Sequence, residues 1–307
     1  MAMVARQDGW QDNRTLSASR CHVGVHSQVI IKYMWYKDLQ GNFKTSGKQT
    51  MQARPDSRYV HSVAVFLTLS WFVIFTGLSF ASEVLQSGPQ RVHVLELYTS
   101  EGCSSCPPAD RWLSELKEDE RLWREFIPIA FHVDYWNDIG WQDRFSSPAY
   151  SERQRNYARS KGLSTVYTPG FLLNGREWRS YFGLRKLALD PGSAAGNLTV
   201  TLEQQTVQAT YQAGGQAPTR PLLNIAVLGF DLITRVDAGE NRGKQLRHDF
   251  TVLGYKTATL SVTEEGYINT TQRPGVTIHA PRSGIAVWIN DEGDLTPLQA
   301  TGGWIMR

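Results

Sequence analysis

The sequence predicts an α/β domain over residues 91–190, followed by an all-β, sandwich-like domain over residues 197–307. In the first region, apolar strand-like runs alternate with helix-like segments, which is the pattern of a sheet with parallel strands. In the second region, short segments of alternating polarity recur between turn residues, and no long helical period competes with them. Between the two regions, the run PGSAAG has the composition of a linker.

Length and composition set broad limits on what the protein does. A chain of 307 residues is long enough for about two domains. Its 41% apolar and 20% charged residues are ordinary for a globular protein, and its net charge of +3 is too small to indicate a nucleic-acid partner. No motif in the sequence points to a cofactor.

An uncharged, apolar run over residues 63–80 follows Arg54 and Arg58 and precedes small residues that end at Ala81. This order predicts an export signal over residues 51–81, cleaved after Ala81. The run is also long enough for an uncleaved membrane anchor. In both cases the basic residues lie upstream, so we expect the rest of the chain on the outer side of the membrane, in the periplasm or outside the cell.

Residues 1–50 lie before the predicted signal and show no clear periodicity. Since the segment that begins at Met51 has the form of a complete signal peptide, we expect residues 1–50 to be a mis-assigned start or a disordered extension. The exported chain would then hold a single cysteine pair, and Cys21 would play no part. Exported compartments are oxidising, so this pair is expected as a disulfide or as a redox couple.

The cysteine pair lies between a predicted strand over residues 92–98 and a predicted helix over residues 107–118. A helix N-terminus carries a partial positive charge, which favours the thiolate form of a cysteine held there. The spacing of Cys103 and Cys106 lets the thiols close into a disulfide, so the pair can cycle between two redox states. The spacing alone also fits a structural disulfide or half of a zinc site, although no second cysteine pair lies nearby.

A second predicted strand, over residues 127–133, brings further side chains toward the cysteines. A strand–helix–strand unit makes two parallel strands with a right-handed crossover, and functional groups gather at the carboxyl ends of such strands. Asp134, Tyr135 and Trp136 follow directly after this strand. We therefore expect them on the same rim as Cys103.

The remainder of the first region predicts a helix over residues 148–161, a strand and hairpin over residues 166–176, and a short helix over residues 184–189. The resulting order of strands and helices resembles the thioredoxin fold. In that fold a cis proline opens the third strand and faces the cysteines, and Thr168-Pro169 matches this position. The resemblance implies that both residues help to hold a substrate chain beside the cysteines.

Four longer motifs extend the resemblance to a more specific family. They are ELYTSEGCSSCPPAD (96–110), FHVDYWNDIGWQD (131–143), RQRNYA (153–158) and VYTPGFLLNG (166–175). In combination they make the sequence similar to the DUF1223 family, which groups exported thioredoxin-like proteins of uncharacterised function. The resemblance covers most of the first region and implies its fold more than any reaction.

Thioredoxins keep a buried acid six positions before the first cysteine as a proton relay, but that position is Leu97 here. We consider Glu96, one residue earlier, as a substitute for this relay. The alternation of side chains along a strand points Glu96 to the opposite face, where its alternative role is a carboxylate paired with an arginine. The sequence leaves both roles open.

Several other side chains near this rim have both a functional and a structural interpretation. His132 and Asp134 can tune the thiols or join them as metal ligands, or they can satisfy structural hydrogen bonds. Tyr135 and Trp136 are candidates for binding a partner polypeptide, but aromatic residues more often pack in the core or in loops. In the second region, the polar hairpin over residues 239–248 offers binding groups whose spacing supports no particular site.

The function predicted first is that of an exported thiol–disulfide oxidoreductase that acts on protein thiols or disulfides and exchanges electrons with a membrane redox partner. Cys103 would form the mixed disulfide, and Cys106 would resolve it. One alternative is a module that binds copper(I) or another soft metal through Cys103, Cys106 and His132. The other alternative is an interaction protein whose disulfide is purely structural.

Overall fold

The computed structural model describes residues 82–161, 165–182, 187–190 and 192–305, which belong to one compact unit. The predicted export signal, the residues before it and Cys21 lie outside the described residues, as do residues 184–186 of the short helix predicted over residues 184–189. Residues 187–189 are described and are not helical. None of the helices within the described ranges is long and apolar enough to cross a membrane.

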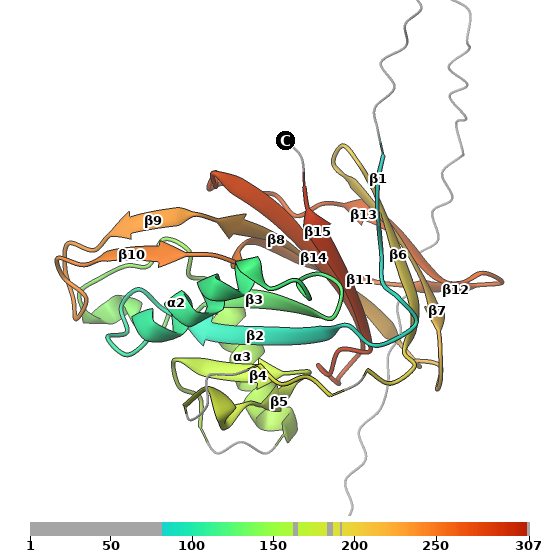
Figure 1. Ribbon diagram of the computed structural model, residues 1–307, viewed down its shortest axis with the longest axis horizontal. Helices are drawn as coiled ribbons and strands as arrows, with labels where there is room; N and C mark the ends of the chain where they lie inside the picture. The colour runs from blue at the N-terminus through green and yellow to red at the C-terminus, as the bar shows by residue number, and fades with distance from the viewer. Residues whose placement is uncertain (1–81, 162–164, 183–186, 191, 306–307) are drawn as a thin grey trace, which may run out of the picture. The chain divides into compact units, whose positions relative to one another are not determined.

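Three sheets contain the strands of the described chain (Figure 1). The largest sheet has eight strands in the order β15 (Gln299–Trp304), β14 (Arg282–Asp291), β8 (Pro221–Phe230), β11 (Thr251–Thr259), β3 (Phe126–His132), β2 (His93–Thr99), β4 (Gly170–Leu173) and β5 (Arg176–Glu177). The second sheet has the order β1 (Glu83–Gln86), β6 (Gly196–Glu203), β7 (Thr206–Ala213), β13 (Gly266–Gln272) and β12 (Ser261–Thr263). The remaining strands, β9 (Leu232–Arg235) and β10 (Gln245–His248), form an antiparallel pair.

The prediction of a thioredoxin-like α/β domain followed by a separate all-β domain is wrong. Strand β3 pairs with β2 on one side, and on its other side it pairs with β11 through Ala130 and Thr251. Strands from before and after the predicted linker therefore share one sheet, and the described chain is mostly β with a sandwich-like arrangement. Sequence patterns report the local conformation and burial of a strand, but they do not report which distant strand it pairs with.

The local elements around the cysteines agree with those read from the sequence. Strand β2 leads into helix α2 (Pro107–Glu115), which continues as the 3-10 helix η1 (Leu116–Glu118). Pro107 and Pro108 occupy the first turn of α2, where the helix amides have no partner and proline costs little. Strand β3 and helix α3 (Pro148–Lys161) follow, and two short 3-10 helices lie in the connections: η2 (Asn137–Ile139) and η3 (Arg179–Phe182).

Helices α2 and α3 pack on opposite faces of the part of the sheet formed by β3, β2 and β4. Trp112 of α2 packs edge-on against Phe171, which pairs with Leu97 of β2. The preceding residue of β2, Glu96, instead binds Arg153 of α3. Because successive side chains of a strand point to opposite faces, residues 97 and 99 face α2, whereas residues 96 and 98 face α3.

A second apolar core lies between the five-stranded sheet and strands β8 and β14. It joins Val200 and Val207 of the five-stranded sheet to Ile225 of β8 and Ile285 of β14. Leu228, also on β8, belongs instead to the core around β2 and β3. Strand β8 is thus buried on both faces, which explains its nearly continuous apolar sequence.

Candidate functional site

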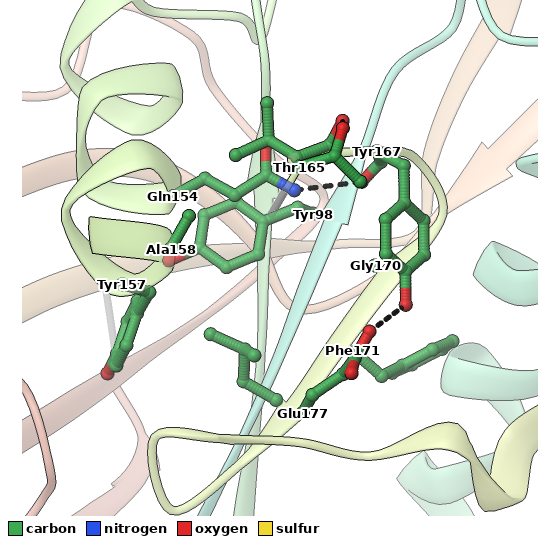
Figure 2. A pocket seen from close by; sticks show the side chains of 11 residues that line it. Tyr98, Gln154, Tyr157, Ala158, Thr165, Tyr167, Gly170, Phe171 and Glu177 are labelled. Atoms are coloured by element: carbon green, nitrogen blue, oxygen red, sulfur yellow. Dashed lines mark hydrogen bonds between the residues drawn. The ribbon is translucent and has the colours of Figure 1, made fainter. Parts of the chain in front are cut away.

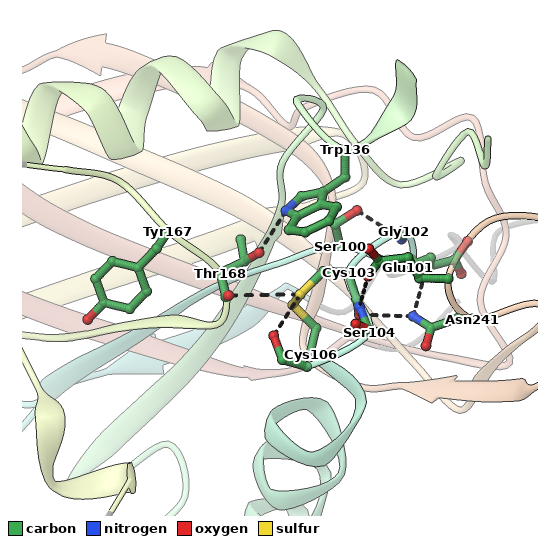
Figure 3. Close-up of a disulfide and its surroundings, with 12 residues drawn as sticks. Ser100, Glu101, Gly102, Cys103, Ser104, Cys106, Trp136, Tyr167, Thr168 and Asn241 are labelled. Atoms are coloured by element: carbon green, nitrogen blue, oxygen red, sulfur yellow. Dashed lines mark hydrogen bonds between the residues drawn. A yellow bond between two sulfur atoms is a disulfide. The ribbon is translucent and has the colours of Figure 1, made fainter. Parts of the chain in front are cut away.

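Cys103 and Cys106 form a disulfide at the N-terminus of α2 (Figure 3). Their Cα atoms are 5.5 Å apart, and Cys106 directly precedes the first helical turn. Both cysteines have 0% exposed surface, so the disulfide is fully covered. A substrate can therefore reach a sulfur only after the covering side chains move.

The loop before β4 covers Cys103 from one side. The peptide bond between Thr168 and Pro169 is cis, and the Thr168 carbonyl oxygen lies 3.8 Å from the Cys103 sulfur. The hydroxyl of Ser105, an exposed residue, lies 3.3 Å from the same sulfur. The structure thus brings Thr168 next to the disulfide (Figure 3), and Pro169 follows it through the cis peptide bond.

The indole of Trp136 packs between the cysteine loop and the Thr168 loop. Its Nε1 donates a 2.8 Å hydrogen bond to Thr168 Oγ1, and a Cβ added to Gly102 would come within 3.1 Å of Trp136 Cβ. Tyr135 instead donates to the Gln154 side chain of α3 at 3.1 Å, and burial raises the pKa of Tyr135 to about 12. Of the two predicted aromatic candidates, Trp136 therefore contacts the cysteine loop, whereas the hydroxyl of Tyr135 lies between Gln154 of α3 and the Thr168 side chain.

The connection between β9 and β10 holds the other side of the cysteine loop. Asn241, which is fully buried, donates from Nδ2 to the carbonyl oxygens of Glu101 at 2.8 Å and Cys103 at 2.9 Å. The Glu240 carboxylate accepts a 3.1 Å hydrogen bond from the Ser104 backbone N–H, and hydrogen bonds from Ser104 lower the pKa of Glu240. A segment predicted only as a polar hairpin thus fixes the backbone around Cys103.

Next to the cysteine loop, five ionisable side chains are buried: Glu101, Asp110, His132, Asp143 and His248. We refer to them as the buried ionisable cluster. His132 Nδ1 lies 2.6 Å from Asp143 Oδ2, and His248 Nε2 lies 3.2 Å from Glu101 Oε1. The two imidazole rings are 5.0 Å apart between centroids. The cluster therefore joins groups from the cysteine loop, α2, β3, β10 and the connection between η2 and α3.

Within this cluster, His132 and Asp143 form an ion pair. Burial lowers the pKa of His132, but the charge of Asp143 and its hydrogen bond outweigh that effect and raise the pKa to about 8. Burial raises the pKa of Asp143, but His132 and two backbone N–H donors outweigh it and leave that pKa lowered. For Asp110, burial is the main cause that raises the pKa, against the opposing charges of His248 and His132.

Glu96, considered above as a proton relay, lies on the other face of the sheet. Its two carboxylate oxygens each accept a 3.0 Å hydrogen bond from Arg153. Tyr98 and Tyr157 donate to the same carboxylate at 2.8 and 2.7 Å. The arginine pairing that the sequence left as an alternative is therefore the arrangement observed, and Glu96 is not brought to the cysteines.

Comparison with known proteins places this site in a family. The family model described as "Protein of unknown function (DUF1223)" matches residues 94–290, which is more than half of the chain. The chain belongs to the DUF1223 family. The matched range contains the disulfide, Pro169 and the β9–β10 connection. No curated protein matches the chain.

Two solved structures are similar to this DUF1223 protein. The crystal structure of protein AGR_C_4864 from Agrobacterium tumefaciens is 24% identical, with a TM-score of 0.49 over 70% of this chain and 95% of that chain. HBP35 of Porphyromonas gingivalis is 14% identical, with a TM-score of 0.47 over 71% of this chain and 76% of that chain. At these levels neither similarity supports a functional argument.

Two of the metal-ligand candidates named from the sequence, His132 and Asp134, are engaged elsewhere in this DUF1223 protein. Asp134 accepts a short hydrogen bond from the Ser151 hydroxyl, and His132 binds Asp143 through Nδ1. Across the described ranges, no three His, Cys, Asp or Glu side chains are placed so that they could hold a metal ion. The ligand set of two cysteines and His132 is therefore not assembled.

The DUF1223 protein also brings residues to the cysteines that sequence reasoning missed. Asp110 had a detectable signal, since it lies four residues after Cys106 and three before Leu113, on the apolar stripe of α2. An acid at a position where the pattern demands an apolar side chain indicates a buried carboxyl. Asp143 had no such signal, because it lies in a connection without periodicity. Asn241 was a possible binding residue of the polar hairpin over residues 239–248, but its spacing pointed to no particular site.

Proposed function

We propose that this DUF1223 protein exchanges thiols and disulfides with other polypeptides through Cys103 and Cys106. The observation that carries the proposal is the position of the disulfide, between the N-terminus of α2 and the loop that contains Thr168 and Pro169. The positive end of the helix stabilises a thiolate formed there and so favours its release from a disulfide. The Thr168 loop supplies backbone groups close to the sulfur that a substrate must reach.

We assign the Cys103 sulfur as the atom that a substrate thiolate attacks, because it is the sulfur in contact with Thr168 and the exposed Ser105. A substrate thiolate attacks the Cys103 sulfur, the bond to Cys106 breaks, and its electron pair leaves on Cys106. A second substrate thiolate then attacks the substrate sulfur of the mixed disulfide, and Cys103 leaves. The substrate dithiol is oxidised, the cysteine pair is reduced, and two protons pass from the substrate thiols to the cysteines. The reverse sequence reduces a substrate disulfide.

Access to Cys103 requires that the cover of the disulfide opens. The Trp136 indole is only partly buried and is fixed to the Thr168 hydroxyl by one hydrogen bond. A substrate chain bound along the Thr168 loop would replace this contact with its own groups. Trp136 is therefore the side chain that we assign to the entrance of the site.

The setting that we propose for this exchange is outside the cytoplasm, since the apolar run over residues 63–80 has the form of an export signal or anchor. Substrates there would be protein thiols or disulfides, and a membrane redox partner would reset the pair. The full burial of both sulfurs favours one competing function. In that function the disulfide only fixes the loop, and the protein binds partners through other surfaces.

The reduction potential of the Cys103–Cys106 pair separates these two functions. Equilibration of the protein with glutathione buffers, followed by alkylation of free thiols, measures it. A potential between about −120 and −270 mV, the range of known oxidoreductases, supports exchange. A potential below about −300 mV indicates a structural disulfide and rejects the proposal.

Activity assays complete the test. We expect the wild-type protein to catalyse the reduction of insulin disulfides by dithiothreitol, and we expect Cys103→Ser to abolish this catalysis. In the absence of dithiothreitol, reduced Cys106→Ser should accumulate a mixed disulfide with insulin on Cys103, because the resolving cysteine is missing. Cys21→Ser, tested in the full-length chain, is the control, since it removes the remaining cysteine of the sequence and should leave the activity unchanged.

A further inference from the structure

The buried ionisable cluster beside the disulfide is unusual for a part of a protein that only packs. Glu101, Asp110, His132, Asp143 and His248 are all at most 6% exposed as residues. Ionisable side chains are rarely buried to this extent unless every charge is paired, because removal from water disfavours the charged form. The pairing within the cluster therefore shows which groups are structural and which are available.

Asp143 has its oxygens fully used. Its Oδ2 accepts from the Glu101 backbone N–H at 2.9 Å and lies 2.6 Å from His132 Nδ1, and its Oδ1 accepts from the Phe145 N–H at 2.9 Å. Glu101 Oε2 likewise accepts a 2.9 Å hydrogen bond from Trp141 Nε1. These contacts assign a structural role to Asp143 and to the Oε2 atom of Glu101.

Four other atoms of the cluster, each able to bind or release a proton, have no hydrogen-bond partner among the described residues. They are Glu101 Oε1, Asp110 Oδ2, His132 Nε2 and His248 Nε2. The 3.2 Å contact between His248 and Glu101 is an ion-pair distance but is not aligned as a hydrogen bond. Each of these four atoms can therefore exchange a hydrogen bond or a proton with a group that approaches it.

Asp110 is the member of the cluster that connects to the disulfide. It lies four residues after Cys106, and its backbone N–H donates to the Cys106 carbonyl at 3.1 Å. Residues four apart on a helix are neighbours on one face, with Cβ atoms about 5–6 Å apart. The Asp110 carboxyl is therefore placed on the same side of α2 as the sulfur that leaves when Cys103 is attacked.

Asp110 also has a route to solvent. A cleft between the first turn of α2 and strand β10 reaches it, lined by Pro107, Asp110, Arg111, Gln245, Leu246 and Arg247. Arg111, Gln245 and Arg247 are exposed and stand at the outer side of this cleft. On its buried side, Asp110 faces the charges of His132 and His248, with Asp143 and Thr99 beside them. A proton can thus enter from solvent and be held next to the disulfide.

We propose that Asp110 carries the proton that Cys106 gains or loses during thiol–disulfide exchange, with His132 and His248 as the positioning residues that stabilise its carboxylate. This inference deepens the proposed function and depends on it. When a substrate thiolate breaks the disulfide, protonated Asp110 gives its proton to the Cys106 thiolate. The carboxylate that remains faces His132 and His248 and regains a proton from solvent. In the reverse direction, the Asp110 carboxylate takes the proton of the Cys106 thiol, and the resulting thiolate attacks the mixed disulfide.

Other buried carboxylates are less suited to this step. Glu101 lies against His248 through one oxygen and accepts from Trp141 through the other. Asp143 is committed to His132 and two backbone donors, and Glu96 is committed to Arg153 on the far face of the sheet. Burial raises the pKa of Asp110, so its proton is held at a higher pH than that of an exposed aspartate. This is the property that a proton donor near neutral pH requires.

The variant that tests the inference is Asp110→Asn, with Asp138→Asn as the matched control, because Asp138 is exposed on η2 near the same rim. The measurement is the pH profile of disulfide reduction by dithiothreitol and of insulin reduction. General acid–base catalysis contributes about 10²- to 10⁴-fold, so we expect Asp110→Asn to slow both reactions by about 100-fold near neutral pH. We expect Asp110→Glu to restore part of the rate and Asp138→Asn to leave it unchanged.

The outcomes separate this inference from the proposed function. A folded Asp110→Asn variant with the wild-type pH profile overturns the role of Asp110 and leaves exchange intact. A wild-type protein without exchange activity overturns both. If Asp110→Asn does not fold, carbon-13 NMR of the wild-type aspartate carboxyls decides the matter. We expect Asp110 to titrate at different pH values in the oxidised and reduced protein, and identical titrations in the two states overturn the inference.

Discussion

Asn241 donates a 2.9 Å hydrogen bond from its side-chain amide to the carbonyl oxygen of Cys103, 138 residues earlier in the chain. The same nitrogen binds the Glu101 carbonyl at 2.8 Å, and the Lys244 ammonium donates to Asn241 Oδ1 at 2.8 Å. One buried side chain therefore satisfies two carbonyl groups of the cysteine loop. The geometry of the disulfide depends in this way on a connection from the C-terminal part of the chain.

The first prediction concerns this contact. Asn241→Ala leaves two carbonyl groups of the cysteine loop without their donor, and an unsatisfied buried polar group costs about 1–3 kcal/mol. We expect the free energy of unfolding to fall by about that amount and the disulfide to be reduced faster by dithiothreitol, since the loop is less well fixed. Denaturant unfolding and reduction kinetics measure the two effects. Arg242→Ala, an exposed neighbour, should change neither, and a wild-type reduction rate in Asn241→Ala would contradict the prediction.

A second prediction follows from the ion pair on the opposite face of the sheet. Arg153 and Glu96 have side chains that are 5% and 1% exposed. Arg153→Met leaves the Glu96 carboxylate buried without its counter-charge, and such a break costs about 3–5 kcal/mol. We expect a loss of this size in the free energy of unfolding, measured by urea denaturation, but an unchanged reduction potential in the fraction that folds.

Arg155→Ala is the control for this second prediction. Arg155 lies on the same helix, but its side chain is 43% exposed and its contact with Glu152 is 3.6 Å long. Exposed ion pairs contribute little to stability, so we expect a change below about 1 kcal/mol. Equal losses in the two variants would show that the Glu96 pair has no special role.

The sequence predicted the parts of the site that depend on local pattern. The strand before Cys103, the proline-started helix after Cys106, and the helix over residues 148–161 were readable from periodicity and from the positions of proline. The strand alternation that turns Glu96 away from α2 was readable too. The position of Thr168-Pro169 came from a resemblance to a fold, and the structure places it beside Cys103.

The parts that depend on distant pairing were not predictable. The contact between Ala130 of β3 and Thr251 of β11 merges two regions that looked like separate domains. The same merger brings His248, at the end of β10, beside His132, at the end of β3, and so creates the buried ionisable cluster. A single sequence carries no signal for such pairings, because each strand could bury its apolar residues against many partners.

The pH dependence of stability gives a third prediction, through His132. Its pKa is raised from 6.5 to about 8 in the folded protein, so folding favours its protonated form. The resulting stabilisation is fully present below about pH 6.5 and is lost as the pH rises through about 8. The shift corresponds to about 2 kcal/mol. We expect the free energy of unfolding from urea titrations to fall by this amount as the pH rises from well below 6.5 to well above 8, with most of the fall between those two values.

Two histidine variants isolate this effect. His132→Gln should remove the decline in stability between the two pH values, because glutamine does not titrate and so forms no pH-dependent ion pair with Asp143. His279→Gln is the control, since His279 is exposed, and it should keep the wild-type decline.

Asp143 makes stability depend on pH in the acid range. Because its pKa is lowered, its contribution is present above the pKa of an unfolded aspartate and is lost as the pH falls below it.

A fourth prediction addresses the entrance of the site. The Trp136 indole binds Thr168 Oγ1 at 2.8 Å, and the Thr168 carbonyl lies 3.8 Å from the Cys103 sulfur. Trp136→Phe and Thr168→Val each remove this hydrogen bond and keep most of the side-chain volume. Because a polypeptide must displace the indole whereas dithiothreitol is small, we expect both variants to change the KM for insulin reduction and to change it in the same direction.

The comparison of substrates makes this fourth prediction specific. The rate of disulfide reduction by dithiothreitol alone should change less than about 3-fold in both variants, since the helix N-terminus and the cysteines stay in place. Ile139→Ala, at an exposed site on η2 next to the same rim, should leave both reactions at the wild-type rate. If Trp136→Phe and Thr168→Val leave the KM for insulin unchanged, the indole does not control access. If they change it in opposite directions, the two residues act separately and not through their shared hydrogen bond.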